Sequence, residues 1–186
     1  MSYDRNMAMD RQKALRAAAD FLGRRPNATQ DEIAAAVGVS RATLHRYFAG
    51  RAALFEALDE YALAHLREAL KTVRAQDGSA ADTLRQLVAA CEPVAGYLTL
   101  LYAQSQDFDA NQPKEAWAAI DAEVKELFVR GQREGEFRPE LNAFWLTEAL
   151  FQLLAGAAWV VQVGGAGRLE FTDMVTDLML HGVARP

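Results

Sequence analysis

The 186-residue sequence has little cysteine and proline, and it contains no internal repeat or low-complexity segment. Its single cysteine, Cys91, excludes an intramolecular disulfide and is typical of a protein kept in a reducing compartment. Few stretches alternate apolar and polar residues, so strands are not expected. With 51% hydrophobic residues the chain is neither disordered nor collagen-like, and it is long enough to bury a core without a metal ion.

The first residues do not predict a signal peptide. The first ten residues carry charges of both signs and no long apolar run, so we expect a cytoplasmic protein. Segment 143–163 is almost wholly apolar and about long enough to cross a bilayer, which takes roughly 20 residues. Because Glu148, Gln152 and Gln162 lie inside it and would be costly in lipid, we interpret it as a helix covered by protein and expect no membrane contact.

The charges divide the chain into a basic head, residues 1–51, and an acidic body, residues 52–186. The head holds nine basic and five acidic groups, a net charge of +4, and the body holds 11 basic and 20 acidic groups, a net charge of −9. This polarity is typical of a protein whose head binds a polyanion. The alternative is solvated surface charge without a function.

Apolar residues recur at spacings of three and four, which predicts an all-α protein of about nine helices. The first helix is expected over 10–23 and ends at a Pro-Asn break. Pro93 lies inside a later helical pattern and predicts a kink or split near Glu92. The later helices of the body are expected over 51–74, 82–104, 113–134, 139–163 and 170–181.

The most informative stretch is 29–48. Thr29 and Glu32 have the spacing of a capping box, in which each side chain accepts a hydrogen bond from the other residue's backbone. They open a short helix, which Gly38 ends by supplying the left-handed residue. This segment therefore predicts a two-turn helix followed by a tight corner.

A second short helix follows directly, capped by Ser40. Leu44 and Phe48 lie four residues apart and are expected to point inward. The remaining residues would face outward or sideways: Arg41, Ala42, Thr43, His45, Arg46 and Tyr47. Two short helices joined by a tight corner form a helix-turn-helix, whose second helix fits the major groove of DNA.

From about residue 10 to residue 58 the sequence resembles the DNA-binding part of the TetR family of transcriptional regulators. The residues that carry the resemblance are Ile33, Ala34, Gly38, Val39, Ser40, Thr43, Leu44, the run from His45 to Phe48, Arg51 and Leu54. The resemblance implies a three-helix DNA-binding domain over 9–55. It also implies a helical domain over 56–186 that binds a ligand and forms a dimer.

Three positions depart from the family pattern. His45 and Tyr47 exchange the usual order of Tyr and His, and Arg51 replaces a Lys at the start of the fourth helix. The Arg preserves the positive charge and adds a bidentate fork for phosphate. Asp31 stands where some members carry a base-contacting Arg, and we interpret it as stabilising the N-terminus of its helix.

The resemblance implies that DNA is contacted by Arg41, Ala42, Thr43, His45, Arg46, Tyr47 and Arg51. Arg41 and Arg46 have no obvious acidic partner in the sequence, which favours this role. Alternatives stay open for the other side chains. Thr43 could be merely solvated, His45 and Tyr47 could pack between helices, and Arg51 could cap the preceding helix.

The body contains no catalytic or metal-binding pattern. His45, His65 and His181 do not have the spacing of helical metal ligands, and no Gly-rich phosphate loop or nucleophile elbow is present. We therefore expect no enzymatic activity, no cofactor and no metal. A lone buried cysteine is usually inert, so Cys91 is not expected to be a redox trigger.

The last two predicted helices, 139–163 and 170–181, carry more apolar surface than one small body can hide. We expect them to form a two-fold, four-helix interface between two copies, with the small residues 155–158 allowing close approach. The alternative is an ordinary internal core. A dimer also suits paired recognition helices, which must reach major grooves about 34 Å apart.

By resemblance, the body should enclose a ligand pocket whose occupation shifts the helix over 51–74. The candidate lining residues are Tyr97, Leu101, Tyr102, Trp117, Phe128 and Phe151. Their spacing is also that of ordinary core residues. The acidic body could favour a cationic, lipophilic ligand, although excess acidic groups more often form a solvated surface.

These observations predict a cytoplasmic homodimeric repressor that binds a palindromic double-stranded operator and releases it when a small molecule fills the body. Three alternatives stay open: a helical ligand-binding protein without DNA affinity, a helical enzyme, and a transcriptional activator of the same fold. The sequence does not determine the effector or the operator.

Overall fold

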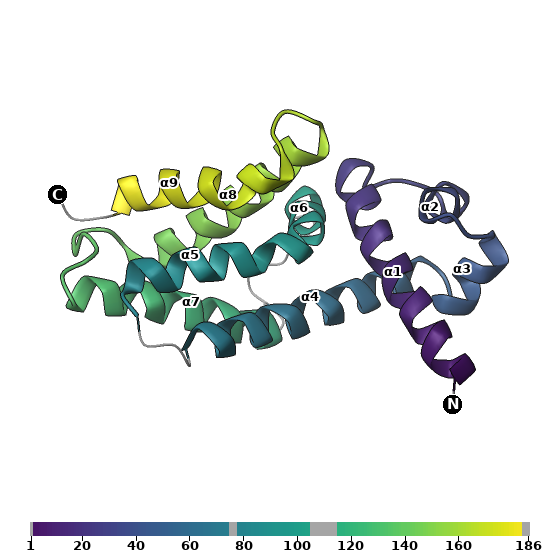
Figure 1. Cartoon of the computed structure of the whole chain (residues 1–186), viewed down its shortest axis with the longest axis horizontal. Helices are drawn as coiled ribbons and strands as arrows, with labels where there is room; N and C mark the ends of the chain where they lie inside the picture. The colour runs from purple at the N-terminus through teal and green to yellow at the C-terminus, as the bar shows by residue number, and fades with distance from the viewer. Residues whose placement is uncertain (1, 75–77, 105–114, 184–186) are drawn as a thin grey trace.

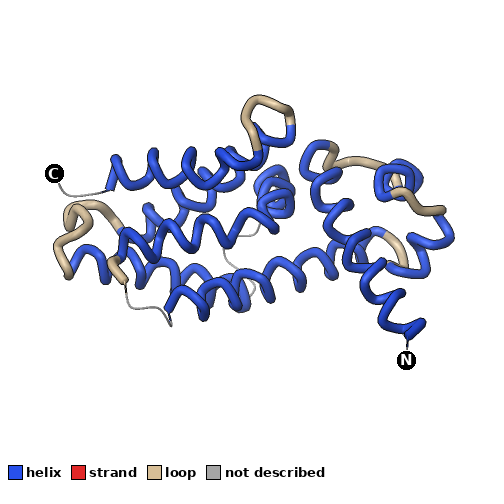
Figure 2. The backbone as a smooth tube through the Cα atoms, in the orientation of Figure 1, coloured by secondary structure: helices blue, strands red, loops and turns tan. Residues whose placement is uncertain are grey.

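Helices make up most of the described part of the chain (Figures 1 and 2). The computed structural model describes residues 2–74, 78–104 and 115–183, and within these ranges it contains nine α-helices, two 3-10 helices and no β-strand. This confirms the all-α expectation. The head lies at one end of the molecule and the bundle of body helices at the other (Figure 1).

Three helices build the head: α1 (Ser2–Arg24), α2 (Gln30–Val37) and α3 (Arg41–Tyr47). The start of α1 differs from the prediction, because the helix extends back to Ser2 instead of beginning near residue 10. The apolar sides of the three helices meet in one core. Its buried members in the head include Leu15, Ala18, Leu22, Ile33, Leu44 and Phe48.

The local signals of the helix-turn-helix act as predicted. The Thr29 backbone N–H donates to Glu32 Oε2 at 2.8 Å, and the Glu32 N–H donates to Thr29 Oγ1 at 3.3 Å, which completes the capping box of α2. Gly38 ends α2 with φ of 78°, a left-handed conformation that favours glycine. The Ser40 hydroxyl accepts from the Thr43 N–H at 3.1 Å and caps α3.

The body begins with the long helix α4 (Arg51–Arg74), which runs without interruption from the head into the bundle (Figure 1). The bundle continues with α5 (Ala80–Cys91), α6 (Ala95–Gln104), α7 (Glu115–Arg133), α8 (Ala143–Gln162) and α9 (Phe171–Val183). The predicted split near Pro93 is confirmed, because a 3-10 helix, η1 (Glu92–Val94), separates α5 from α6.

The predicted start of α8 is wrong by four residues. Helix α8 begins at Ala143 instead of Pro139, because the Asn142 carboxamide accepts from the N–H groups of Phe144 and Trp145 and so caps the helix there. A 3-10 turn, η3 (Arg168–Glu170), precedes α9.

Helix α8 is long and apolar enough to cross a membrane by length and composition, with a mean hydropathy of 1.5 over its most apolar window. A core helix of a soluble protein passes the same test. Leu150 and Leu154 of α8 are completely buried, and the helix packs against α6, α7 and α9. The helix therefore has the contacts of a protein core.

The head is fixed to the body where α1 crosses α6. A Cβ atom on Gly96 would lie 2.5 Å from Asp20 Oδ1, and one on Gly23 would lie 2.9 Å from the Gly96 carbonyl oxygen. Two glycines thus allow the helix backbones to approach closely. Beside this crossing, Arg168 forms an ion pair with Glu92, so the loop before α9 is tied to the turn before α6.

A half-buried carboxyl group lies where α7 packs on α8. Burial raises the pKa of Asp121 from its ordinary value of 3.8 to about 6, and the nearby Glu148 carboxylate adds to the rise. The folded protein therefore binds more protons than the unfolded chain between these two values. The stabilising contribution is complete below pH 3.8 and is lost as the pH rises through about 6.

We predict that Asp121→Asn raises the melting temperature by roughly 2–4 °C at pH 7.5, which corresponds to about 1 kcal/mol for a chain of this size. At pH 4.5 the substitution should change little, because Asp121 is already neutral in the folded protein. Circular dichroism melts at the two pH values measure the difference. Asp177→Asn, on the exposed side of α9, is the control, and an equal shift at both pH values would contradict the prediction.

Candidate nucleic-acid interface and ligand site

Helix α3 presents most of its side chains to solvent because two apolar residues hold it to the head. Leu44 is completely buried and Phe48 is 2% exposed. Among the predicted DNA contacts on α3, Arg41, Ala42, His45 and Arg46 are exposed, and Thr43 and Tyr47 are half-buried. The face opposite Leu44 is therefore open, polar and basic, as a helix that enters a DNA groove requires.

Arg41 has an acidic partner that the sequence did not reveal. Its Nη1 lies 3.1 Å from Asp31 Oδ2 on α2, and both side chains are mostly exposed. The interpretation of Asp31 as a group that only stabilises its own helix is therefore incomplete. An exposed ion pair of this kind contributes between zero and about 1 kcal/mol, so a phosphate or base edge can replace the carboxylate at small cost.

Arg46 and Tyr47 lie together at the end of α3. The Arg46 guanidinium is 5.8 Å from the centre of the Tyr47 ring, and this ring meets Phe48 edge to face at 6.3 Å. Tyr47 thus has a packing role, one of the alternatives left open by the sequence. Its half-exposed side chain still faces the same side of the head as Arg46.

Arg51 is engaged with the loop before α2. Its Nη1 donates to the Ala28 carbonyl at 2.6 Å, its Nη2 donates to the Pro26 carbonyl, and its guanidinium lies 4.8 Å from the centre of the Phe55 ring. The Arg51 guanidinium therefore binds this loop. It does not cap the preceding helix, which was the alternative role that the sequence left open. Arg51 fastens the start of α4 to the helix-turn-helix, and its phosphate contact stays a prediction.

Arg11 of α1 also contacts α3, which the sequence analysis did not predict. Its Nε donates to the Tyr47 carbonyl oxygen at 3.2 Å, at the C-terminal end of α3. Its position 36 residues before Tyr47 gives no local signal that the two residues meet.

In the body, two of the predicted pocket residues share one carboxylate. Asp59 Oδ1 of α4 accepts hydrogen bonds from the Tyr97 hydroxyl at 2.7 Å and from Trp117 Nε1 at 2.8 Å. The two rings stack with their centres 6.4 Å apart. Burial and the bond to Asp59 raise the pKa of Tyr97, so its hydroxyl stays protonated and donates. Asp59 thereby joins α4 to α6 and α7.

Two other predicted pocket residues, Phe128 and Phe151, belong to the same hydrophobic core. Phe128 is completely buried and packs against Phe137, with ring centres 6.0 Å apart, as an ordinary core residue would. Phe151 is half-buried against the core. Leu101 and Tyr102 belong to α6, but their side chains lie outside the described part of the structure.

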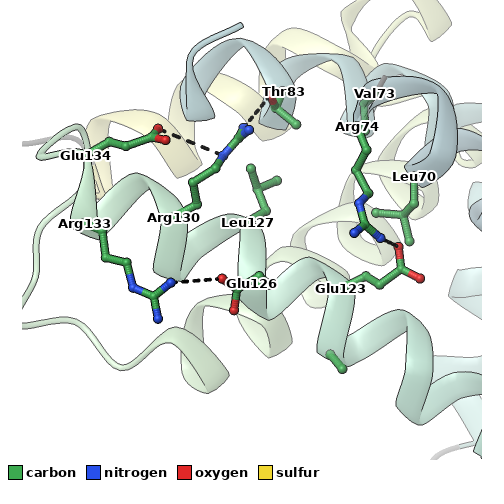
Figure 3. Close-up of a pocket in the computed structure, with 11 residues that line it drawn as sticks. Leu70, Val73, Arg74, Thr83, Glu123, Glu126, Leu127, Arg130, Arg133 and Glu134 are labelled. Carbon is green, nitrogen blue, oxygen red and sulfur yellow. Dashed lines mark hydrogen bonds and ion pairs between the residues drawn. The ribbon is translucent and has the colours of Figure 1, made fainter. Parts of the chain in front are cut away.

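Two cavities open elsewhere, and none of the described predicted pocket residues lines either of them. One, of about 560 Å³, lies between α4, α5 and α7 and has Leu70, Val73 and Leu127 among its apolar lining residues (Figure 3). Ion pairs join some of its charged lining residues, among them Arg74–Glu123 at 2.9 Å and Arg133–Glu126 at 3.3 Å. The other, of about 480 Å³, lies beside the crossing of α1 and α6.

The described part of the body contains metal-ligating residue types and one thiol, that of Cys91. Within the ranges that the structure describes, no three His, Cys, Asp or Glu residues are grouped to hold a metal ion. Cys91 is buried, and burial raises the pKa of its thiol to about 12. At neutral pH this thiol is protonated and therefore a poor nucleophile.

Large apolar side chains remain exposed on α8 and α9. Trp145, Trp159 and Val163 are 64%, 46% and 55% exposed, and Leu178 of α9 is 63% exposed. Of the small residues 155–158, which the sequence predicts to allow close approach of a second copy, the three alanines are buried within the protomer. Gly156 alone is exposed among them.

Known proteins are similar to this chain in sequence and in fold. Residues 14–58 match the sequence profile of bacterial regulatory proteins of the tetR family. The chain is 27% identical over 177 residues to the HTH-type transcriptional regulator NfxB of Pseudomonas aeruginosa, covering 94% of this chain and 95% of NfxB. It is 25% identical over 173 residues to the HTH-type transcriptional repressor LfrR of Mycolicibacterium smegmatis, covering 93% of this chain and 89% of LfrR.

Among solved structures, the TetR-like regulator LfrR from Mycobacterium smegmatis in complex with proflavine gives a TM-score of 0.67 at 22% identity, covering 96% of this chain and 99% of that one. The ketosteroid regulator KstR2 of Mycobacterium tuberculosis gives 0.63 at 18% identity, with 95% of each chain covered. NfxB and LfrR are transcriptional regulators and not enzymes. The helix-turn-helix of this chain thus matches the TetR family of bacterial regulatory proteins, and over nearly its whole length the chain is similar to DNA-binding transcriptional regulators.

Proposed function

We propose that this regulator is a cytoplasmic homodimeric repressor that binds a palindromic operator and leaves it when a small molecule enters the body. In this proposal residues 9–55 form the DNA-binding domain and residues 56–186 form the domain that binds the effector and the second copy. The observation that carries the proposal is helix α3, capped by Ser40 and held by two buried side chains, with Arg41 and Arg46 on its open face.

The side chains of the head have distinct roles in this proposal. Arg41, Ala42 and Thr43 lie in the first turn of α3, the part of a recognition helix that meets base edges. The Thr43 methyl group suits a thymine methyl, and the Arg41 fork suits guanine. His45, Arg46, Tyr47 and Arg51 follow further along and hold phosphates. Arg51 has N–H groups left for a phosphate beyond the two that bind the loop.

The relatives support repression and a small-molecule effector. LfrR is named a transcriptional repressor, and its solved structure holds proflavine. In the present chain we place the effector beside Tyr97 and Trp117, two of the six residues predicted to line a pocket. Asp59 connects these two residues to α4, the helix that starts at Arg51 beside the helix-turn-helix. A molecule that separates Tyr97 or Trp117 from Asp59 would therefore shift the helix that carries Arg51.

The exposed face of α8 and α9 supports the proposed dimer. Trp145, Gly156, Trp159 and Val163 recur at spacings that place them on one side of α8, and Leu178 is exposed on the neighbouring α9. An apolar face of this kind on a soluble protein is typical of an interaction surface. A two-fold pairing of α8 and α9 would cover these side chains in both copies.

We predict that the protein selects a palindromic duplex from a random-sequence DNA pool and that Arg41→Ala weakens binding to this duplex by about 1–3 kcal/mol and relaxes its base preference. Asp31→Ala should strengthen binding, because it removes a carboxylate from the DNA-facing side and releases Arg41. Mobility shifts with the selected duplex measure both effects. Arg85→Ala, on the exposed side of α5, is the control, and failure of the wild-type protein to select any duplex would refute the proposed function.

Ligand release gives a second prediction. Small molecules that raise the melting temperature of the free protein should lower its affinity for the selected duplex, because a ligand that binds one state better shifts the population toward it. A shift from 1:99 to 99:1 requires a preference of about 5.5 kcal/mol for the released state. Stabilising ligands that all leave DNA affinity unchanged would contradict regulation by release.

The dimer gives a third prediction. A Cβ atom on Gly156 would meet nothing within 4 Å in the protomer, so Gly156→Glu leaves the fold intact and buries a charge only if a partner covers this face. We expect this substitution to raise the dimer dissociation constant by more than about tenfold, as measured by sedimentation equilibrium. Gln86→Glu on α5 adds the same charge elsewhere and should have no effect, and an unchanged dimer in Gly156→Glu would place the interface on another surface.

A further inference from the structure

Arg11 reaches the recognition helix from α1 and makes two contacts there. Its Nε donates to the Tyr47 carbonyl oxygen at 3.2 Å, and its guanidinium carbon lies 4.8 Å from the centre of the Phe48 ring. Tyr47 is the last residue of α3 and Phe48 is its C-terminal cap. Both contacts therefore act at the C-terminal end of the helix that faces DNA.

Helix α3 depends on such contacts because it is only seven residues long. Isolated helices shorter than about 12 residues are marginal in water, so α3 needs support from outside. Ser40 satisfies its N-terminal end, but at its C-terminal end the capping residue Phe48 is extended with φ of −140°, and the left-handed Gly50 comes two residues later. An arginine at this end satisfies a terminal carbonyl and favours the negative end of the helix dipole.

The two contacts suit arginine and not lysine. The planar guanidinium can donate to a carbonyl through one N–H while its face lies on an aromatic ring, and it holds one orientation while doing so. A lysine ammonium preserves the charge but has neither the planar face nor the fixed fork. Replacement of Arg11 by Lys therefore separates the geometry of the contact from its charge.

Helix α1 is itself anchored to the body through Gly23 and Gly96 at its other end. Arg11 thus connects the end of the recognition helix to a helix whose position the body determines. On the other side of the helix-turn-helix, Arg51 donates a hydrogen bond to the loop before α2. The orientation of α3 is consequently held from both α1 and α4.

We propose that Arg11 is a positioning residue for DNA recognition, which sets the orientation of α3 through the Tyr47 carbonyl and the Phe48 ring. This inference rests on the proposed function in assuming that α3 enters DNA. It assigns Arg11 an effect on the affinity for the preferred sequence, in contrast to the uniform contribution of a phosphate contact.

The experiment compares Arg11→Ala and Arg11→Lys with Lys13→Ala, which removes an exposed positive charge from the same helix. We expect both Arg11 variants to bind the duplex selected by the wild-type protein about tenfold more weakly, the loss of one charge-assisted hydrogen bond. In affinity for a random-sequence duplex and in the salt dependence of binding, Arg11→Ala should match Lys13→Ala, and Arg11→Lys should match the wild-type protein. Circular dichroism melts confirm that the variants are folded.

Hydrogen exchange of the free protein provides a readout that needs no DNA. Backbone amides of α3 should exchange faster in both Arg11 variants than in Lys13→Ala, while those of α5 stay unchanged. Unchanged hydrogen exchange in α3 would overturn the proposal. A second contradicting outcome is wild-type affinity in Arg11→Lys together with a salt slope reduced by about one in Arg11→Ala, because a phosphate contact behaves in this way. If the wild-type protein selects no duplex, the proposed function fails while exchange still tests the contact.

Discussion

The DNA-binding surface depends on anchoring a helix that is too short to be stable alone. Of the seven residues of α3 only Leu44 is buried in the core, and the buried Phe48 follows directly after the helix. The other side chains of α3 are therefore available to face a duplex. The cost is that its orientation must come from neighbours. Ser40 at one end and Arg11 at the other satisfy backbone groups that such a short helix cannot pair internally.

Because the orientation of α3 must come from neighbouring elements, two helices link the head to the body. Helix α4 carries Arg51, which binds the loop before α2, and two turns further along it carries Asp59, which binds Tyr97 and Trp117 in the body. Helix α1 runs from the α3 terminus to the close crossing at Gly96. Displacement of packed body helices would therefore reach the head through continuous helices, a physical route for the regulation proposed here.

Electrostatics separate the two parts. The head carries a net charge of +4 and the body one of −9, so a polyanion is attracted to one end of the molecule and repelled by the other. Within the head, the carboxylate of Asp31 is held by Arg41, which limits its repulsion of phosphates. At the contact between α7 and α8, burial and the nearby Glu148 carboxylate raise the pKa of Asp121 to about 6, so protonation removes their repulsion only below that pH.

The amino-acid sequence by itself determined the features that depend on neighbours along the chain. The capping box of Thr29 and Glu32, the left-handed Gly38, the Ser40 cap and the break at Pro93 each need only a few adjacent residues, and so the all-α class and the helix-turn-helix could be predicted. Only the tertiary structure decided the partners of the charged groups. Arg11 contacts Tyr47 across 36 residues of sequence, and Asp59 contacts Trp117 across 58 residues. At such separations helical periodicity shows which side of a helix is buried, but it does not show which side chain lies opposite.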